Sequence, residues 1–168
     1  MEAMVLDAGP LIYLAKLDAL GVLPAGHRTA VVTPSVWNEV ARPALAFRFP
    51  EIASIERARD VGWLEVHPLA PSEEALADDL AARLSGLHRG ELECLAVASE
   101  RGWLACFHER QASRLARTMG IEPVHLVELL FKGIADAGRL ESCLRRFARL
   151  TNLATADLDE LMRLITER

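Results

Sequence analysis

Five short runs of apolar and β-branched residues recur along the chain, and segments with the periodicity of a helix separate them. The runs span residues 3–6, 29–32, 63–66, 103–107 and 121–124. Strands that alternate with helices form βαβ units, and such units build a mostly parallel sheet with helices on both faces. We therefore predict an α/β fold, a three-layer α/β/α sandwich with a mostly parallel central sheet and a helical C-terminal tail.

The chain has 168 residues, enough for one domain with a real core and too few for two. After the fifth run the pattern is helical only, with helices expected at residues 126–134, 140–150 and 157–165. We predict a single domain over residues 1–168, with a core at about 3–125 and a helical C-terminal extension at about 126–168.

Charge and composition restrict the class of partner and the compartment. A formal net charge of −5 argues against a protein held to nucleic acid mainly by bulk electrostatics, although a cluster of metal-binding carboxylates would itself add negative charge. The three cysteines have no CxxC spacing, which predicts small core residues rather than a zinc site or a disulfide framework. The N-terminus lacks the features of a signal peptide, and no apolar run approaches the roughly 20 residues that span a bilayer. We predict a cytoplasmic protein without a membrane partner.

Acidic side chains follow or flank the predicted strands at the same edge of the sheet. They are Asp7 after the first run, Glu39 in the helix after the second, Glu91 and Glu93 behind Gly90, and Glu109 beside His108 after the fourth. Ligands of parallel sheets lie beyond the carboxyl ends of the strands. Hard divalent cations such as Mg²⁺ and Mn²⁺ prefer oxygen ligands. The pattern therefore predicts a metal site at this edge.

Three motifs make a resemblance to a known family specific. Residues 5–12 resemble the opening of PIN domains, in which the first catalytic Asp ends strand one. Residues 33–40 are similar to the second motif of that family, and residues 90–98 resemble the Gly-Glu-x-Glu form of its third motif. That form is typical of a bacterial and archaeal branch related to VapC-type toxins. The order and spacing of the motifs fit over about residues 3–125.

The fourth position departs from this family pattern. PIN domains of this branch usually carry Asp-Asp-Arg after the fourth strand, and this chain has His108, Glu109 and Arg110 there. A neutral imidazole binds Mn²⁺ or Zn²⁺ but is a poor ligand for Mg²⁺. Glu109 has the right chemistry, but it has a longer side chain and stands one residue later. The metal site is therefore intact with a shifted ligand, biased toward Mn²⁺, or lost.

The resemblance implies a metal-dependent endoribonuclease that hydrolyses RNA phosphodiester bonds with Mg²⁺ or Mn²⁺. Asp7, Glu39 and Glu91 are the implied catalytic ligands. Glu93 is a second choice because residues i and i+2 do not share a helix face, and His108 and Glu109 complete the candidate ligands. Arg110 and Arg114, one turn apart, are candidate RNA-binding residues. The resemblance further suggests the toxin of a toxin–antitoxin pair, with an antitoxin protein and a second copy of the chain as partners.

Other interpretations stay open on the sequence alone. Asp7 is equally suited to cap a helix, and Glu91 to carry a favourable charge at a helix N-terminus. The change at His108 motivates a rival function, a PIN fold that no longer cleaves and binds RNA or protein. A phosphatase that uses Asp7 as nucleophile is disfavoured, because such haloacid-dehalogenase-like enzymes use a second Asp where this chain has Gly9. A basic stripe at residues 145–149 is expected on the surface, as a possible partner contact.

Overall fold

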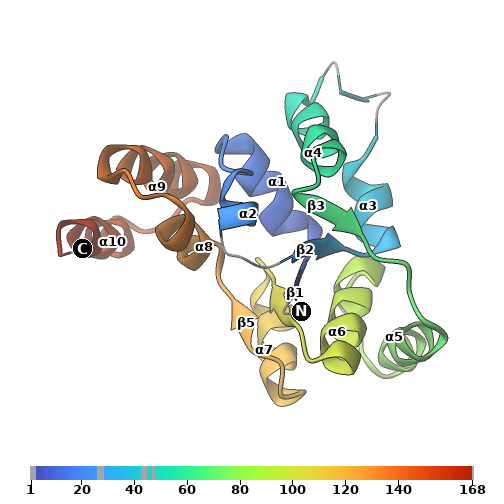
Figure 1. Ribbon diagram of the computed structural model, residues 1–168. Coiled ribbons are helices and arrows are strands. Elements are labelled where there is room, and N and C mark those ends of the chain that lie inside the picture. The colour runs from blue at the N-terminus through green and yellow to red at the C-terminus, as the bar shows by residue number, and fades with distance from the viewer. Residues whose placement is uncertain (1–2, 26–28, 43–44, 47, 168) are drawn as a thin grey trace.

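A computed structural model describes residues 3–25, 29–42, 45–46 and 48–167. Five parallel strands form one sheet in the order β3-β2-β1-β4-β5 (Figure 1). The strands are β1 (Ala3–Leu6), β2 (Thr29–Val32), β3 (Leu64–Val66), β4 (Leu104–Cys106) and β5 (Pro123–Val124). This all-parallel sheet with helices on both faces confirms the predicted α/β class.

Ten helices join and surround the strands in the described part of the chain. They are α1 (Ala8–Lys16), α2 (Val22–Ala25), α3 (Pro34–Val40), α4 (Pro50–Asp60), α5 (Pro71–Arg83), α6 (Arg89–Arg101), α7 (Arg110–Thr118), α8 (Leu126–Gly133), α9 (Ala137–Thr151) and α10 (Thr155–Thr166). Helices α1 and α4 cover one face of the sheet, whereas α6 and α7 cover the other, with α5 outside α6 (Figure 1).

The central strand β1 is buried along its whole length, which fits a strand with helices on both faces. Its register places Leu6 beside Cys106 of β4 and Val5 beside Val31 of β2. Because the strands are parallel, the segments that follow β1, β2 and β4 leave the sheet at one common edge.

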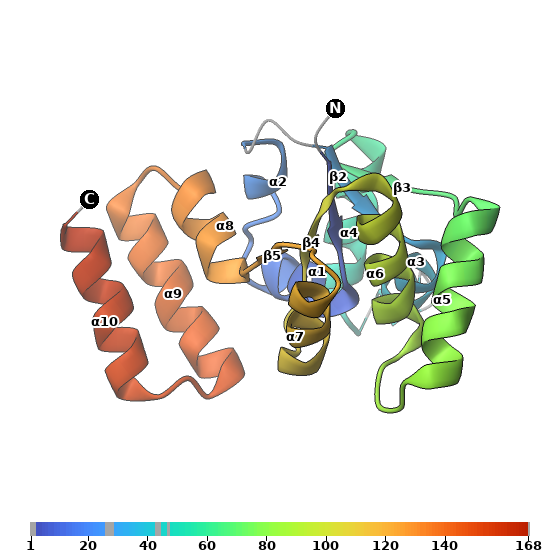
Figure 2. The same ribbon diagram turned by 90° about the horizontal axis from the view of Figure 1, so that it is seen from below.

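Helices α8, α9 and α10 lie side by side at one end of the molecule (Figure 2). Helix α9 is tied to the end of α1, because Arg146 Nη2 donates to the carbonyl of Lys16 at 2.6 Å and Arg139 Nη2 donates to that of Asp18 at 3.2 Å. It also buries Leu144 and Phe147. By contrast, α10 buries no residue and packs on α9. The predicted boundary at about residue 125 thus falls just before helices of which α9 shares the core.

The structure corrects two local expectations. Helix α2 was not predicted, because four residues are too few to show helical periodicity. Ser72 was expected to cap the helix after β3, but α5 begins at Pro71 and its N-cap residue is Ala70. Glu73 replaces the expected cap, since its carboxylate accepts the amide of Ala70 at 2.6 Å. Proline at the first helical position is the stronger start signal here.

Candidate metal-binding site

Asp7 lies at the centre of the edge predicted to hold the site. Its amide donates to the carbonyl of Cys106 at 3.1 Å, which extends the β1–β4 pairing by one residue, and α1 begins directly after it. Only 8% of the residue is exposed. A Cβ placed on Gly90 of α6 would lie 3.7 Å from Asp7 Oδ1 and 3.0 Å from Val36 Cγ2. The absence of a side chain at Gly90 therefore lets α6 approach both this carboxylate and α3.

The environment of Asp7 opposes its ionisation. Burial, followed by the negative charges of Glu91 and Glu39, raises its pKa from 3.8 to about 6, although the amides of Ala8 and Gly9 act in the opposite direction. Asp7 also serves as the N-cap residue of α1, but its side chain makes no capping hydrogen bond there. The simple capping interpretation thus does not account for this carboxylate.

Glu91 stands in the first turn of α6, next to Asp7 in the electrostatics of the site. One oxygen, Oε2, accepts the amide of His88 at 2.8 Å. The other oxygen, Oε1, is buried and has no hydrogen-bond partner among the described residues. Buried acceptors are nearly always paired, so an unpaired carboxylate oxygen beside a second buried acid marks a place suited to a cation.

Glu39 approaches the same edge from α3, and unlike the other two acids it is exposed. It lines a surface hollow of about 470 Å³ whose other residues are Ser35, Asn38, Arg42, His88, Arg89 and Gly90. The structure therefore brings the charges of Asp7, Glu39 and Glu91 close enough to interact. Across residues 3–25, 29–42, 45–46 and 48–167, however, no three His, Cys, Asp or Glu side chains converge tightly enough to hold a metal ion as they stand.

Glu93 has different contacts from Glu91. Its carboxylate accepts the hydroxyl of Ser35 at 2.6 Å, the amide of Ser35 at 3.0 Å and Nε of Arg89 at 2.9 Å. Burial alone would raise its pKa, but the hydrogen bonds from Ser35 and Arg89 outweigh burial and lower it. A carboxylate already held by three donors is a brace between α3 and α6. A role for Glu93 as a metal ligand stays a prediction that these contacts do not favour.

His108 and Glu109 lie at the edge without converging on the acids. The imidazole of His108 packs against Tyr13 with a centroid distance of 4.7 Å, and the ring of Phe147 from α9 lies 6.5 Å away. Its Cβ is close to Gly9, where an added Cβ would approach it to 3.1 Å. Glu109 is exposed and is the N-cap residue of α7. Their roles as ligands stay predictions.

The donor set fits a hard divalent cation. It consists of carboxylates, two of them buried, with one orphaned oxygen and one raised pKa. A bound cation would satisfy that oxygen and favour the ionised form of Asp7. Asp7, Glu39 and Glu91 are therefore the residues that would hold it.

Two contributors could not be recognised from the sequence. Ser35 is indicated there only as part of a helix cap, because nothing in a single sequence pairs it with an acid 58 positions away. The rings that hold His108 come from α1 and from the C-terminal helix α9, and no local pattern links them. The Gly-Glu-x-Glu spacing did contain one signal: two acids on different helix faces must meet different partners.

A parallel α/β domain with interacting carboxylates where its strands end is a nuclease-like fold. A family model described as a PIN domain matches residues 3–155, and the chain belongs to the PIN-domain family. PIN domains are in general nucleases that act on RNA or other nucleic acids and typically depend on divalent metal ions. The match continues beyond residue 125 through α8 and α9.

Comparison with curated proteins gives no match. Within the described residues, no helix combines the length and apolar character that crossing a bilayer requires.

Proposed function

We propose that this PIN domain is an endoribonuclease that hydrolyses RNA phosphodiester bonds with a divalent cation held by Asp7, Glu39 and Glu91. The observation that carries the proposal is the orphaned Oε1 of Glu91, buried beside the raised pKa of Asp7. Two acids that are buried together without a counter-charge destabilise a fold, so their presence favours a bound cation.

The residues of the chain have distinct tasks in this proposal. Asp7 and Glu91 supply buried negative charge on adjoining elements, and Glu39 adds an exposed carboxylate that faces the solvent side. Since the pKa of Asp7 is about 6, this carboxylate is mostly ionised at neutral pH and is available to a cation. When bound, a divalent cation supplies positive charge that stabilises developing negative charge at phosphorus and makes water a stronger acid.

The direct test measures cation binding before any RNA is chosen. Mn²⁺ and then Mg²⁺ are titrated calorimetrically into chelator-treated protein, with Asp7→Asn and Glu91→Gln as site variants. Glu74→Gln on α5 is the matched control, because Glu74 is exposed and its replacement removes the same charge. Saturable binding that the site variants lose and the control keeps supports the site. Equal binding by all four proteins, or none by the wild type, overturns it.

A second candidate function is a PIN fold that binds RNA or protein without cleaving. The observation that favours it is the position of His108, whose ring is engaged with Tyr13 instead of converging on the acids. The two candidates differ in one respect: the binding module takes up RNA but shows no Asp7-dependent hydrolysis with Mn²⁺ or Mg²⁺. A pool of total cellular RNA is a suitable first substrate, because it does not presuppose a target sequence.

The nuclease proposal extends to a biological role and to partners. We place the chain in the cytoplasm as the toxin of a toxin–antitoxin pair, bound in the resting cell by an antitoxin protein and self-associated as a homodimer. Induced expression of the wild type should then arrest growth, and Asp7→Asn should relieve the arrest. Sedimentation equilibrium tests the dimer independently. A monomer at all concentrations, or arrest that Asp7→Asn leaves unchanged, would remove the corresponding part of this proposal.

A further inference from the structure

Helix α7 carries three arginines on a single exposed face. Arg110, Arg114 and Arg117 are spaced four and three residues apart, which on an ideal helix places them within about 60° of one another and over about 10 Å of its length. All three are exposed. The opposite face buries Ala112, Ser113 and Ala116 against the core. We call Arg110, Arg114 and Arg117 the α7 arginine stripe.

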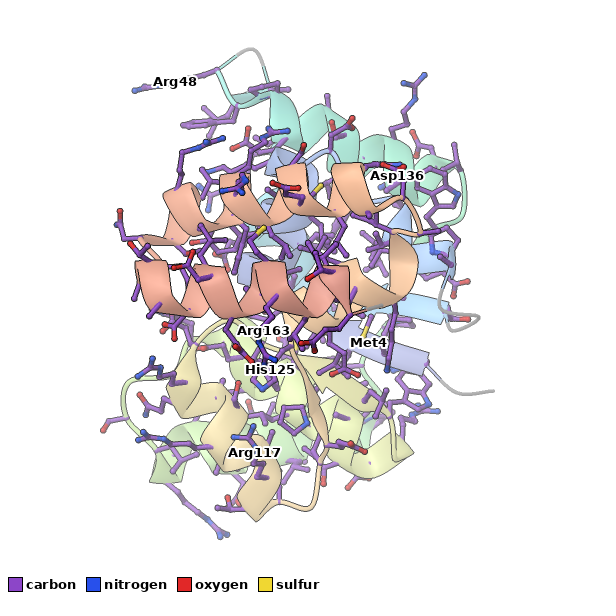
Figure 3. All side chains as sticks on the ribbon, turned by 90° about the vertical axis from the view of Figure 1, so that its left-hand side faces the viewer. Met4, Arg48, Arg117, His125, Asp136 and Arg163 are labelled. Carbon is purple, nitrogen blue, oxygen red and sulfur yellow. The ribbon has the colours of Figure 1, made fainter. Side chains whose placement is uncertain are left out.

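The stripe differs from most other arginines because no carboxylate neutralises it. In the part of the chain that the structure describes, none of its three arginines forms an ion pair with Asp or Glu. Six other arginines do form such pairs: Arg59, Arg83, Arg89, Arg101, Arg145 and Arg163. Arg117 instead turns its Nη2 toward Nε2 of His125, at 3.4 Å (Figure 3). Three uncompensated cations within two helical turns are unexpected in a chain of net charge −5, unless an anion binds there.

The other basic groups offered by the sequence are already engaged. Arg89, beside the acidic site, pairs with Asp78 and Glu93. In the basic stripe of α9, Arg145 pairs with Glu141 and Arg146 donates to the carbonyl of Lys16. These side chains would have to break an existing interaction to bind an anion, whereas the α7 arginine stripe would not.

The stripe begins at the edge that holds the acids. Cys106 pairs with Leu6, the residue before Asp7, and α7 starts only four residues after Cys106. Ser113 anchors this first turn, since its hydroxyl donates to the carbonyl of Glu109 at 3.1 Å. A rigid helix thus carries its cations outward from the position where the proposed reaction takes place.

We infer that the α7 arginine stripe binds the phosphates of the RNA strand next to the bond that is cut. The inference rests on the proposed nuclease function and specifies how the site would hold its substrate. A guanidinium group can donate two parallel hydrogen bonds to one phosphate, so three arginines on one face suit successive phosphates of a strand. Such contacts position a strand without reading its sequence. The stripe therefore accounts for substrate retention, and selectivity has to arise elsewhere.

The test measures the binding of a short, labelled, single-stranded oligoribonucleotide by fluorescence anisotropy over a series of KCl concentrations. Full-length Asp7→Asn protein is the background, so that cleavage does not interfere. The variant Arg110→Ala/Arg114→Ala/Arg117→Ala is compared with Arg83→Ala/Arg145→Ala/Arg163→Ala. This control removes the same three charges from exposed, ion-paired positions on other helices.

The salt dependence distinguishes direct binding of phosphates from a change in overall charge. For a single strand, each phosphate that the protein neutralises steepens the slope of log affinity against log salt by about 0.7, so the stripe variant should have a slope shallower by about 2. The ion-paired control should retain nearly the whole slope. Replacement of the stripe by three lysines should preserve most of the slope yet weaken binding, because lysine cannot form the bidentate hydrogen bonds. Equal slopes for the stripe variant and the control would overturn the inference.

Two further outcomes separate this inference from its neighbours. If unlabelled polyglutamate displaces the RNA as well as unlabelled RNA does, the stripe is a general polyanion or protein contact and its assignment to RNA is wrong. If the stripe variant binds RNA normally while wild-type protein still cleaves, the stripe fails and the nuclease stands. If binding depends on the stripe but no cation supports cleavage, the nuclease fails and the stripe stands as part of a binding module.

Discussion

Ser35 on α3 donates both its amide and its hydroxyl to the carboxylate of Glu93 on α6, at 3.0 and 2.6 Å. This pairing separates two acids that stand only two residues apart in the sequence. Glu93 faces α3 and joins the helix that carries Glu39 to the helix that carries Glu91, whose own charge acts on Asp7 and whose Oε1 stays unpaired. One acid thus holds the site together and the other is available to a cation.

We predict that Glu93→Gln and Glu91→Gln have opposite effects. Glu93→Gln should lower the free energy of unfolding by about 2 kcal/mol, because a buried acceptor of three donors loses its charge. The folded fraction should still bind Mn²⁺. Glu91→Gln should lose Mn²⁺ binding while its urea midpoint stays near that of the wild type. Urea melts and calorimetric titrations of both variants check this, and loss of Mn²⁺ binding in both, at equal stability, would make Glu93 a ligand.

Asp7 should destabilise the metal-free fold at neutral pH. Its pKa is 3.8 in the unfolded reference and about 6 in the folded protein, so the folded state binds the proton more tightly. The stability of the metal-free protein therefore falls as pH rises from about 4 to about 6 and then levels off. The rise in pKa corresponds to about 3 kcal/mol of lost stability above pH 6.

The corresponding prediction is that Asp7→Asn raises the Tm of chelated protein by several degrees at pH 7 and by much less at pH 4. Mn²⁺ should raise the Tm of the wild type and leave that of Asp7→Asn unchanged. Differential scanning fluorimetry with and without chelator measures both effects. A lower Tm for Asp7→Asn at pH 7 would show that the carboxylate stabilises the fold, and the proposed electrostatic conflict would be wrong.

Glu73 should contribute stability that acid removes. This fully buried carboxylate accepts Nε of Arg101 and the amide of Ala70, both at 2.6 Å, and Nε2 of His67 lies 3.1 Å from it. Burial raises its pKa, but these hydrogen bonds outweigh burial and lower it below 4.5. For a lowered carboxyl pKa, the stabilisation is present above the unfolded value and disappears as pH falls through the folded one.

We therefore predict that Glu73→Gln lowers the free energy of unfolding by about 3 kcal/mol at pH 7, because it breaks a buried ion pair on one side. The difference from the wild type should shrink below pH 4. Glu74→Gln, one residue away and exposed, is the control and should change the stability little. Urea melts at pH 7 and pH 3.5 give the comparison, and a constant difference between the two pH values would contradict the assigned pKa.

The order of strands and helices was predictable from the sequence, because burial on both faces makes each strand a continuous apolar run. The Asp7, Glu39 and Glu91 positions could be named from motif spacing. Their different environments could not, since the exposure of Glu39 and the orphaned oxygen of Glu91 depend on how α3 and α6 cross. The brace from Ser35 to Glu93 and the packing of Phe147 near His108 are long-range interactions that leave no periodic signal in a single chain.

The close crossing of α8 and α2 should make Gly133 irreplaceable. A Cβ on Gly133 would lie 2.5 Å from Cβ of Val22 and 2.9 Å from its Cα, so a backbone would have to move. Gly133→Ala should lower the free energy of unfolding, as measured by urea melts, by about 1–3 kcal/mol through overpacking. Gly138→Ala in α9 is the matched control, because the nearest described atom is Asp136 Oδ1 at 3.6 Å. There the better helix propensity of alanine should leave stability equal or raised by up to about 1 kcal/mol.

His108 offers a test of whether the fourth ligand position still serves the cation. The PIN pattern has Asp here, whereas in this protein an imidazole packs on Tyr13 at 4.7 Å. His108→Asp exchanges that ring packing for a carboxylate at the edge that Asp7 and Glu91 occupy. The added charge should tighten Mg²⁺ binding by about tenfold, while removal of the aromatic packing lowers fold stability by about 0.5–1.5 kcal/mol.

His108→Asn separates these two effects, because it removes the same aromatic packing without adding a charge. Both variants should therefore show a similar fall in urea midpoint, and only His108→Asp should gain affinity for Mg²⁺ in calorimetric titration. If both variants bind Mg²⁺ more weakly than the wild type, the imidazole itself is a ligand. If His108→Asp binds like His108→Asn, the side chain at this position faces the Tyr13 and Phe147 rings and not the cation, and the three acids form the whole site.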